Sequence, residues 1–249
     1  MHVLNILLEG AINSYDPTSG TEPMLTFHAS IGYAMNDRVE GKLFFDYFFT
    51  GSTISNEIAQ KLESIKKDKG EVFIISLSHS HEGTPNGEIP MWMMYGDNGN
   101  GVLLRFDFKR LLESVKQQMC SIEKIEYKNN SEIKKIAEEK RAIMKKEMKE
   151  DLLNAIFKES FLYKDIHWNY EDEYRIIKQE KTVDYKNGKY GIVAYSKIQI
   201  PLSCLNGITI GPLAHQDIVQ QSLASYIEKI RGIYPSFNCK VYNSQIEIR

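Results

Sequence analysis

The sequence predicts a single mixed α/β domain of the α+β class, with a central, largely antiparallel sheet. The chain has 249 residues, of which 42% are hydrophobic and 26% charged. This composition is typical of a globular protein that can bury a sizeable core. Strand-like apolar runs and segments of helical periodicity alternate without the regular βαβ rhythm of a parallel sheet. No repeat and no linker divides the sequence, so we expect one domain over residues 1–249.

Elements in the first third of the chain follow from apolar spacing and from glycine and proline positions. Apolar residues recur at helical spacing over 54–67, which predicts a helix. The run VFIISLS predicts a strand over 71–78 that is buried on both faces. Ahead of these we expect a helix at 2–10, a loop at 12–22, a strand at 24–30, and a helix or an extended run at 39–49.

The longest helical pattern covers residues 131–162, which we interpret as a long helical insertion packed on one side of the domain. Its many glutamates and lysines predict a solvated face with i,i+4 pairs; a surface for nucleic acid or a partner is the alternative. Before it we expect a loop at 79–90, a short helix at 91–95, a turn at 97–101, a strand at 102–106, a helix at 108–119 and a strand at 122–127. After it we expect strands at 174–178 and 190–200 joined by a turn at 187–188, a strand at 208–210, a helix at 216–230 and a strand at 239–242.

Charge and cysteine content exclude several classes of protein. There are 31 basic and 33 acidic residues, a net charge of -2, which argues against a protein held to nucleic acid mainly by bulk positive charge. Cys120, Cys204 and Cys239 lie far apart, which fits a reducing compartment better than a disulfide scaffold or a cysteine zinc site. The N-terminus lacks the basic lead of a secretory signal. We therefore expect a cytoplasmic protein with no membrane partner.

The segment HWNYEDEYR holds the densest group of reactive side chains. If it is extended, Glu171, Glu173 and Arg175 face one way, while Asp172 and Tyr174 face the other. Two carboxylates on one face can raise one pKa, which suits acid–base work or the binding of ribose hydroxyls. The alternative is an exposed strand in which Arg175 neutralises one glutamate.

Three other motifs carry side chains or spacings that suit binding or metal chemistry. PMWMMYG supplies Trp92 and Tyr95, whose rings either line a pocket or pack in the core. GDNGNG matches no phosphate-binding loop and is interpreted as a plain turn. His79 and His81 are spaced to share a metal, but the sequence fixes no third ligand, so a polar loop is favoured and no metal is expected.

Six segments taken together resemble a known family. In chain order they are MNDRVEG, VFIISLSHS, MWMMYGDNGNGVLLRFD, IEY, WNYEDEYRI and ITIGPLA. This order is similar to that of the prokaryotic domain-of-unknown-function family 2971. The family's pattern is LND-x-x-E, an SFS strand, MW-x-x-Y with a glycine turn and a strand ending in FD, W-x-x-E-x-EYR, and a late IxIG. The resemblance runs from about residue 24 to about residue 220.

The resemblance implies a fold and an activity. Family members occur among bacterial phage-defence and abortive-infection genes, and their motifs are arranged similarly to those of ADP-ribosyltransferase-like folds. It therefore implies an enzyme that uses NAD as a substrate, with Glu173 contacting the nicotinamide ribose and Glu171 as its partner. The acceptor would be a protein or a nucleic acid. The NAD-binding residues implied in this way are His28, Ser76, Ser78, Trp92, Tyr95 and Arg175.

The sequence departs from the family pattern at its beginning. Family members start with a strand resembling LYHYTS, just before the helix that reads HVLNILLEG here. We therefore expect the family's first strand to be missing, which leaves three alternatives: the chain is truncated, His28 in TFHAS takes over from the family's histidine, or the protein does not bind NAD. A purely structural histidine is the other interpretation of His28. Two other functions stay open: a defence protein that grips nucleic acid through its lysine-rich helix, and a non-catalytic interaction or sensor module.

Overall fold

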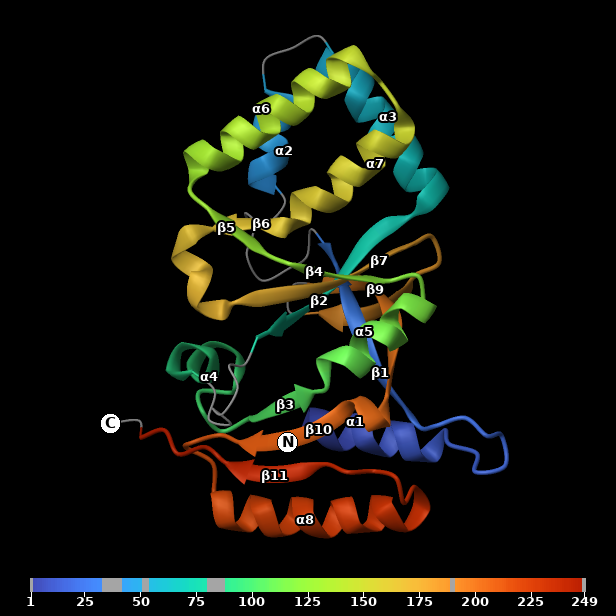
Figure 1. Ribbon diagram of the computed structural model, residues 1–249, viewed down its shortest axis with the longest axis vertical. Helices are drawn as coiled ribbons and strands as arrows, with labels where there is room; N and C mark the ends of the chain where they lie inside the picture. The colour runs from blue at the N-terminus through green and yellow to red at the C-terminus, as the bar shows by residue number, and fades with distance from the viewer. Residues whose placement is uncertain (1, 33–41, 51–53, 80–87, 189–190, 248–249) are drawn as a thin grey trace. The chain divides into compact units, whose positions relative to one another are not determined.

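A computed structural model describes residues 2–32, 42–50, 54–79, 88–188 and 191–247 (Figure 1). The chain divides into two compact units, each assembled from separate stretches of sequence. Unit 1 comprises Met1–Phe27, Ser80–Gln118 and Ile198–Arg249, and unit 2 comprises His28–His79 and Met119–Lys197.

Unit 2 is built on a six-stranded sheet with the order β4-β7-β2-β1-β9-β8. In that order the strands are β4 (Ser121–Lys124), β7 (Glu173–Glu180), β2 (Glu71–Ser78), β1 (Met24–Ile31), β9 (Gly191–Pro201) and β8 (Asp184–Gly188). The pairs β4/β7, β7/β2, β2/β1 and β9/β8 are all antiparallel. The predicted α+β class with a large antiparallel sheet is confirmed.

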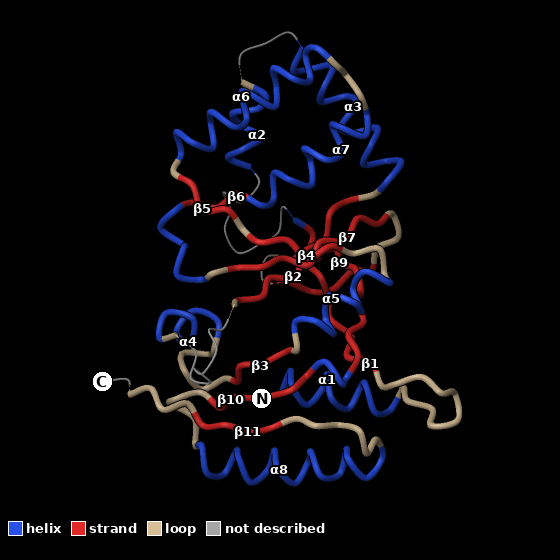
Figure 2. The backbone as a smooth tube through the Cα atoms, viewed as in Figure 1, coloured by secondary structure: helices blue, strands red, loops and turns tan. Residues whose placement is uncertain are grey.

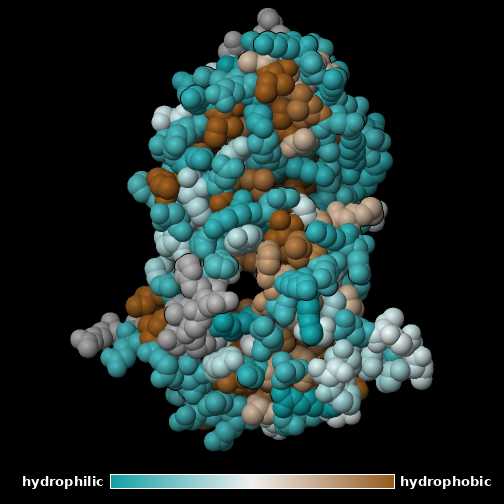
Figure 3. All heavy atoms as spheres, viewed as in Figure 1, coloured by the Kyte–Doolittle hydropathy of each residue, from teal (hydrophilic) through white to brown (hydrophobic). Residues whose placement is uncertain are grey.

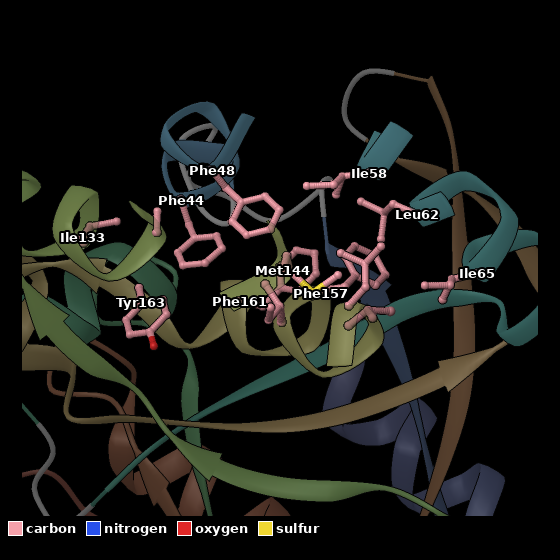
Figure 4. Close-up of a cluster of buried hydrophobic side chains, with 14 of the residues drawn as sticks. Phe44, Phe48, Ile58, Leu62, Ile65, Ile133, Met144, Phe157, Phe161 and Tyr163 are labelled. Carbon is pink, nitrogen blue, oxygen red and sulfur yellow. The ribbon is translucent and has the colours of Figure 1, made fainter. Parts of the chain in front are cut away.

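Four helices of unit 2 form one group (Figure 2). They are α2 (Lys42–Phe49), α3 (Ile54–Lys69), α6 (Asn130–Lys146) and α7 (Glu150–Glu159). Their apolar sides enclose a core that also takes in Val72, Ile74 and Ile177 from the sheet. In Figure 4 the rings of α2 point into this core, where Phe44 stacks on Tyr163 with ring centroids 5.5 Å apart. The aromatic stretch, for which the sequence allows a helix or an extended run, is helical from Lys42 to Phe49, and the helical spacing places Phe44 and Phe48 in the core.

The prediction of one long helix over 131–162 is wrong. The Asn129 side chain caps α6 in a capping box with Glu132, and α6 ends at Lys146. A new helix, α7, then runs to Glu159 and is followed by the short 3-10 helix η2 (Ser160–Leu162). The break lets Met144 of α6 and Leu153 of α7 enter the same core, which one straight helix would not allow.

The outer face of these helices is solvated, as the sequence predicts. Lys140 pairs with Glu159, and Lys149 with Glu147, each at 2.7 Å. The surface seen in Figure 3 is mainly hydrophilic over this region, with smaller hydrophobic patches among it. These lysines satisfy carboxylates of their own unit, but neither pair has the predicted i,i+4 spacing.

Two further expectations for unit 2 need correction. The strand expected at 122–127 is two strands in different sheets, β4 and β5 (Glu126–Lys128), because Ile125 between them turns into the core. Strand β5 pairs with β6 (Tyr163–Asp165) in parallel. Strand β2 is buried on both faces only in its first half, since Ser76 and Ser78 are exposed.

In chain order the elements of unit 1 are α1 (His2–Asn13), α4 (Ile89–Tyr95), β3 (Val102–Phe106), α5 (Phe108–Gln117), the 3-10 helix η4 (Leu202–Cys204), β10 (Leu205–Ile210), α8 (Gln216–Ile233) and β11 (Lys240–Asn243). The unit contains a three-stranded sheet with the order β11-β10-β3, in which β10 runs parallel to β11 and antiparallel to β3. Helix α8 lies beside β11 (Figure 1). Throughout the described ranges, no helix is both long and apolar enough to cross a membrane.

Candidate functional site

The register of β2 and β7 brings four of the expected site residues together. Ser76 lies directly opposite Arg175, and Ser78 directly opposite Glu173. Directly opposed residues of an antiparallel pair point to the same face of the sheet, and so do residues two apart on one strand. The two serines, the glutamate and the arginine therefore share one face.

His28 lies on this same face. Ser30 of β1 pairs with Ile74 of β2, and Ile74 shares its face with Ser76 two residues further on. His28, two residues before Ser30, points the same way. We call these five residues on three neighbouring strands the polar row: His28, Ser76, Ser78, Glu173 and Arg175.

The β7 end of the polar row is a buried cluster of ions. Lys164 Nζ lies 2.5 Å from Glu171 Oε2 and 3.2 Å from Glu173 Oε2. Arg175 Nε lies 2.7 Å from Glu173 Oε1. All four side chains are buried, with Arg175 at 0% exposure. Two acids and two bases balance, which is the condition under which buried charges are tolerated.

The cluster keeps Glu173 ionised. Burial alone would raise the pKa of this carboxyl, but the hydrogen bond and charge of Arg175, a hydrogen bond from Ser76 and the charge of Lys164 outweigh it. The pKa of Glu173 is therefore lower than its ordinary value. Its backbone N–H donates to Tyr127 Oη at 2.8 Å. Burial, together with the charges of Glu173 and Glu171, raises the pKa of Tyr127 to about 12, so that hydroxyl stays neutral.

Glu171 reaches the cluster by a different route from the one expected. The segment is not extended at this point: the 3-10 helix η3 (Ile166–Glu171) ends there, and Asp172 is left-handed with φ 37°. Lys164 then bridges Glu171 to Glu173. From Glu173 onward the strand is extended, so the alternation places Tyr174 on the opposite face.

Asp172 organises a second, more exposed group. Its carboxylate lies 3.1 Å from His79 Nδ1 and 2.9 Å from Lys124 Nζ. The pKa of Asp172 is lowered: partial burial opposes this, but Lys124 and His79 prevail. His79 also donates its backbone N–H to the Asp172 carbonyl at 2.9 Å. His81, the other histidine of the His79–His81 spacing, lies outside the described residues.

Trp92 and Tyr95 belong to α4 of unit 1. Trp92 is buried, and its carbonyl accepts hydrogen bonds from the N–H groups of Gly96 and Gly99. A Cβ at Gly96 would lie 2.6 Å from the Trp92 ring, which explains the glycine there. Trp92 therefore anchors the glycine turn, and Tyr95 is 49% exposed.

The comparison with known families concerns the middle of the chain. Residues 91–176 match the family DUF2971, described as a protein of unknown function. This segment of the chain is therefore similar to DUF2971. The resemblance found in the sequence motifs is confirmed over these residues. No curated protein and no solved structure matches the chain.

The DUF2971 segment contains the whole ion cluster, whereas His28, Ser76 and Ser78 precede it. Sequence reasoning missed Lys164 and reached Tyr127 only as part of the IEY motif. A lysine inside the apolar run FLYKDI was the available signal, since such a lysine needs a buried acid. Among the residues that the structure describes, no three His, Cys, Asp or Glu side chains are grouped to hold a metal ion.

Proposed function

We propose that this protein is an NAD-dependent ADP-ribosyltransferase-like enzyme in which Glu173 contacts the nicotinamide ribose. The observation that supports this best is the polar row. A histidine, two serines and a glutamate lie on one face of three adjacent strands, as the family resemblance implies for such a site. An enzyme that consumes NAD would also suit a toxin or a phage-defence effector.

The proposed reaction breaks the bond between C1′ of the ribose and the nicotinamide nitrogen. Nicotinamide leaves with the bonding electrons, and the acceptor's nucleophile bonds to C1′ and loses its proton. With water as acceptor, the product is ADP-ribose. The ribose carries positive charge in the transition state, and an ionised carboxylate at low dielectric stabilises that charge. The lowered pKa of Glu173 provides this carboxylate at neutral pH.

The exposure pattern indicates how a substrate would reach Glu173. His28, Ser76 and Ser78 are exposed, while Glu173 is 3% exposed. Ser76 donates a hydrogen bond to the Glu173 carboxylate. A ribose hydroxyl that takes the place of the Ser76 hydroxyl would make the same bond. The substrate would therefore enter over β1 and β2, and Glu171 and Lys164 would hold Glu173 from behind.

The deciding measurement is nicotinamide release from NAD, with mixed protein and nucleic-acid acceptors. We expect release by the wild type and a loss of at least about a hundredfold in Glu173→Gln. Because Glu173 is buried, that variant must be shown to be folded by circular dichroism and a melting curve.

Substitution of an exposed residue of the polar row tests the effect on activity without the loss of stability expected at buried Glu173. We expect His28→Ala to lower kcat/KM about tenfold with an unchanged Tm, because one hydrogen bond to substrate is lost. His215→Ala removes an exposed histidine of unit 1 and is the matched control. No release by the wild type with any acceptor would contradict the proposal and favour a non-catalytic module.

A further inference from the structure

A group of basic side chains continues the face of the polar row onto β9 and β8. The His28 ring packs on Tyr195 of β9, with ring centroids 4.1 Å apart. Lys186 Nζ of β8 lies 5.3 Å from the centre of the Tyr195 ring. Lys197, two residues after Tyr195, points the same way and pairs with Asp184 at 2.7 Å. We call His28, Lys186 and Lys197 the basic group.

Positive charge exceeds negative charge at this place. Among the described residues, the charges that act on His28 are those of Lys186, Lys197 and Asp184, and Asp184 lies directly opposite Tyr195. Burial is the main reason that the pKa of His28 is lowered, and the two lysines add to it, whereas Asp184 opposes it. The lysines are thus close enough to act on the imidazole. An excess of positive charge around one group favours the binding of an anion.

We infer that the basic group binds the diphosphate of the substrate. That this diphosphate is the one in NAD rests on the proposed function; the binding of a diphosphate does not. The strand order β7-β2-β1-β9-β8 places Glu173, Ser76, His28, Lys197 and Lys186 on successive strands across the sheet. Neighbouring strands are about 4.8 Å apart, so an extended dinucleotide with its nicotinamide ribose at Ser76 and Glu173 carries its phosphates toward β1 and β9.

Tyr195 brings Lys186 next to His28. Its ring is 9% exposed, covered by His28 on β1 and by Lys186 on β8. An ammonium over an aromatic face is held in place while its N–H groups stay available to a second partner. Tyr195 therefore positions Lys186 as Asp184 positions Lys197, and the phosphate oxygens would accept hydrogen bonds from both ammonium groups.

The test is calorimetric titration of the full chain with inorganic pyrophosphate and, separately, with ADP-ribose. We expect Lys186→Gln and Lys197→Gln each to weaken binding of both probes about tenfold, because each removes a charge-assisted hydrogen bond. Lys69→Gln is the matched control: Lys69 is a lysine of the same unit that also pairs with an aspartate, Asp151, at 2.7 Å. It should bind both probes as the wild type does.

These measurements distinguish failure of the diphosphate site from failure of the proposed enzyme. Lysine-dependent binding without nicotinamide release would uphold the diphosphate site and overturn the proposed enzyme. Nicotinamide release with an unchanged KM for NAD in a variant that carries both Lys186→Gln and Lys197→Gln would uphold the proposed enzyme and overturn the diphosphate site. Absence of binding by the wild type, or equal weakening in Lys69→Gln, would overturn the diphosphate site.

Discussion

Glu173 shows how much one carboxylate depends on its surroundings. Arg175 and Lys164 hold its oxygens, and Tyr127 accepts its backbone N–H. Such a cluster is more informative about function than about stability, because buried ion pairs are often replaceable by apolar residues at no cost in free energy. Removal of a single partner, in contrast, lowers the free energy of unfolding, because it leaves the remaining buried charges uncompensated.

We expect Glu173→Gln to lower the free energy of unfolding by about 3 kcal/mol, because Arg175 stays buried with one fewer carboxylate. Urea denaturation measures this. Glu123→Gln is the control: Glu123 lies opposite Arg175 on β4 but is exposed, so the change should be below about 0.5 kcal/mol. Equal losses in the two variants would contradict the cluster as described.

The same carboxyl predicts a pH dependence. Its pKa is lower in the folded protein than the ordinary value of 4.5. The unfolded chain therefore takes up the proton first as the pH falls, and the stabilisation is complete above 4.5 and lost as the pH drops through the lower folded value. The stability gap between wild type and Glu173→Gln should narrow below pH 4.5 in urea titrations. A stability difference between the two proteins that stays constant from pH 7 to pH 3 would contradict the lowered pKa of Glu173.

Among the elements, α6 has the most sharply defined beginning. Asn129 accepts the N–H of Glu132 at 3.0 Å, and the Glu132 carboxylate accepts the N–H of Asn129 at 2.9 Å. We expect Asn129→Ala to cost about 1 kcal/mol of stability, because the backbone N–H of Glu132 loses its side-chain acceptor. Lys135→Ala, at an exposed position inside α6, should change little. The cap is ruled out as the cause if both variants lose the same amount in chemical denaturation.

Sequence periodicity located most elements, and its failures have physical causes. Periodicity located β2 at Glu71–Ser78 because a short apolar run that follows a glycine and ends in polar residues is typical of a buried strand. It missed the break after Lys146, because α6 and α7 each keep helical spacing and only tertiary packing on one core separates them. It also missed β8, whose exposed residues Tyr185 and Asn187 carry no burial pattern.

The site shows the same division. The alternation of a strand predicted that Glu173 and Arg175 share a face, and the register confirms this. That Lys164 lies between Glu171 and Glu173 depends on η3, a turn that no periodicity announces. The approach of Lys186 to Tyr195 depends on pairing between β8 and β9, which a single sequence does not fix.

At the scale of the whole molecule, each unit has its own hydrophobic core, and the two cores share no residue. The sequence shows no linker at two of the junctions because they fall inside strands, at Phe27–His28 in β1 and at Lys197–Ile198 in β9. A composition change marks a linker only where the chain leaves regular structure.

The two tryptophans report on the units separately, since Trp92 lies in unit 1 and Trp168 in unit 2. Phe48→Ala, in the core of unit 2, should cost about 3–5 kcal/mol there. In single-tryptophan backgrounds we expect it to lower the urea midpoint seen by Trp168 more than the one seen by Trp92. Identical shifts at both probes would show that the two cores unfold as one.

The scattered make-up of unit 1 has a consequence for synthesis on the ribosome. Every residue of unit 2 has been made by Lys197, whereas β3 waits for its partner β10, which begins at Leu205. About 100 residues separate the end of β3 at Phe106 from that point, which at about 5–20 residues per second is roughly 5–20 s of translation. During that interval β3 is an open edge in the nascent chain, and it is there that a chaperone would be needed.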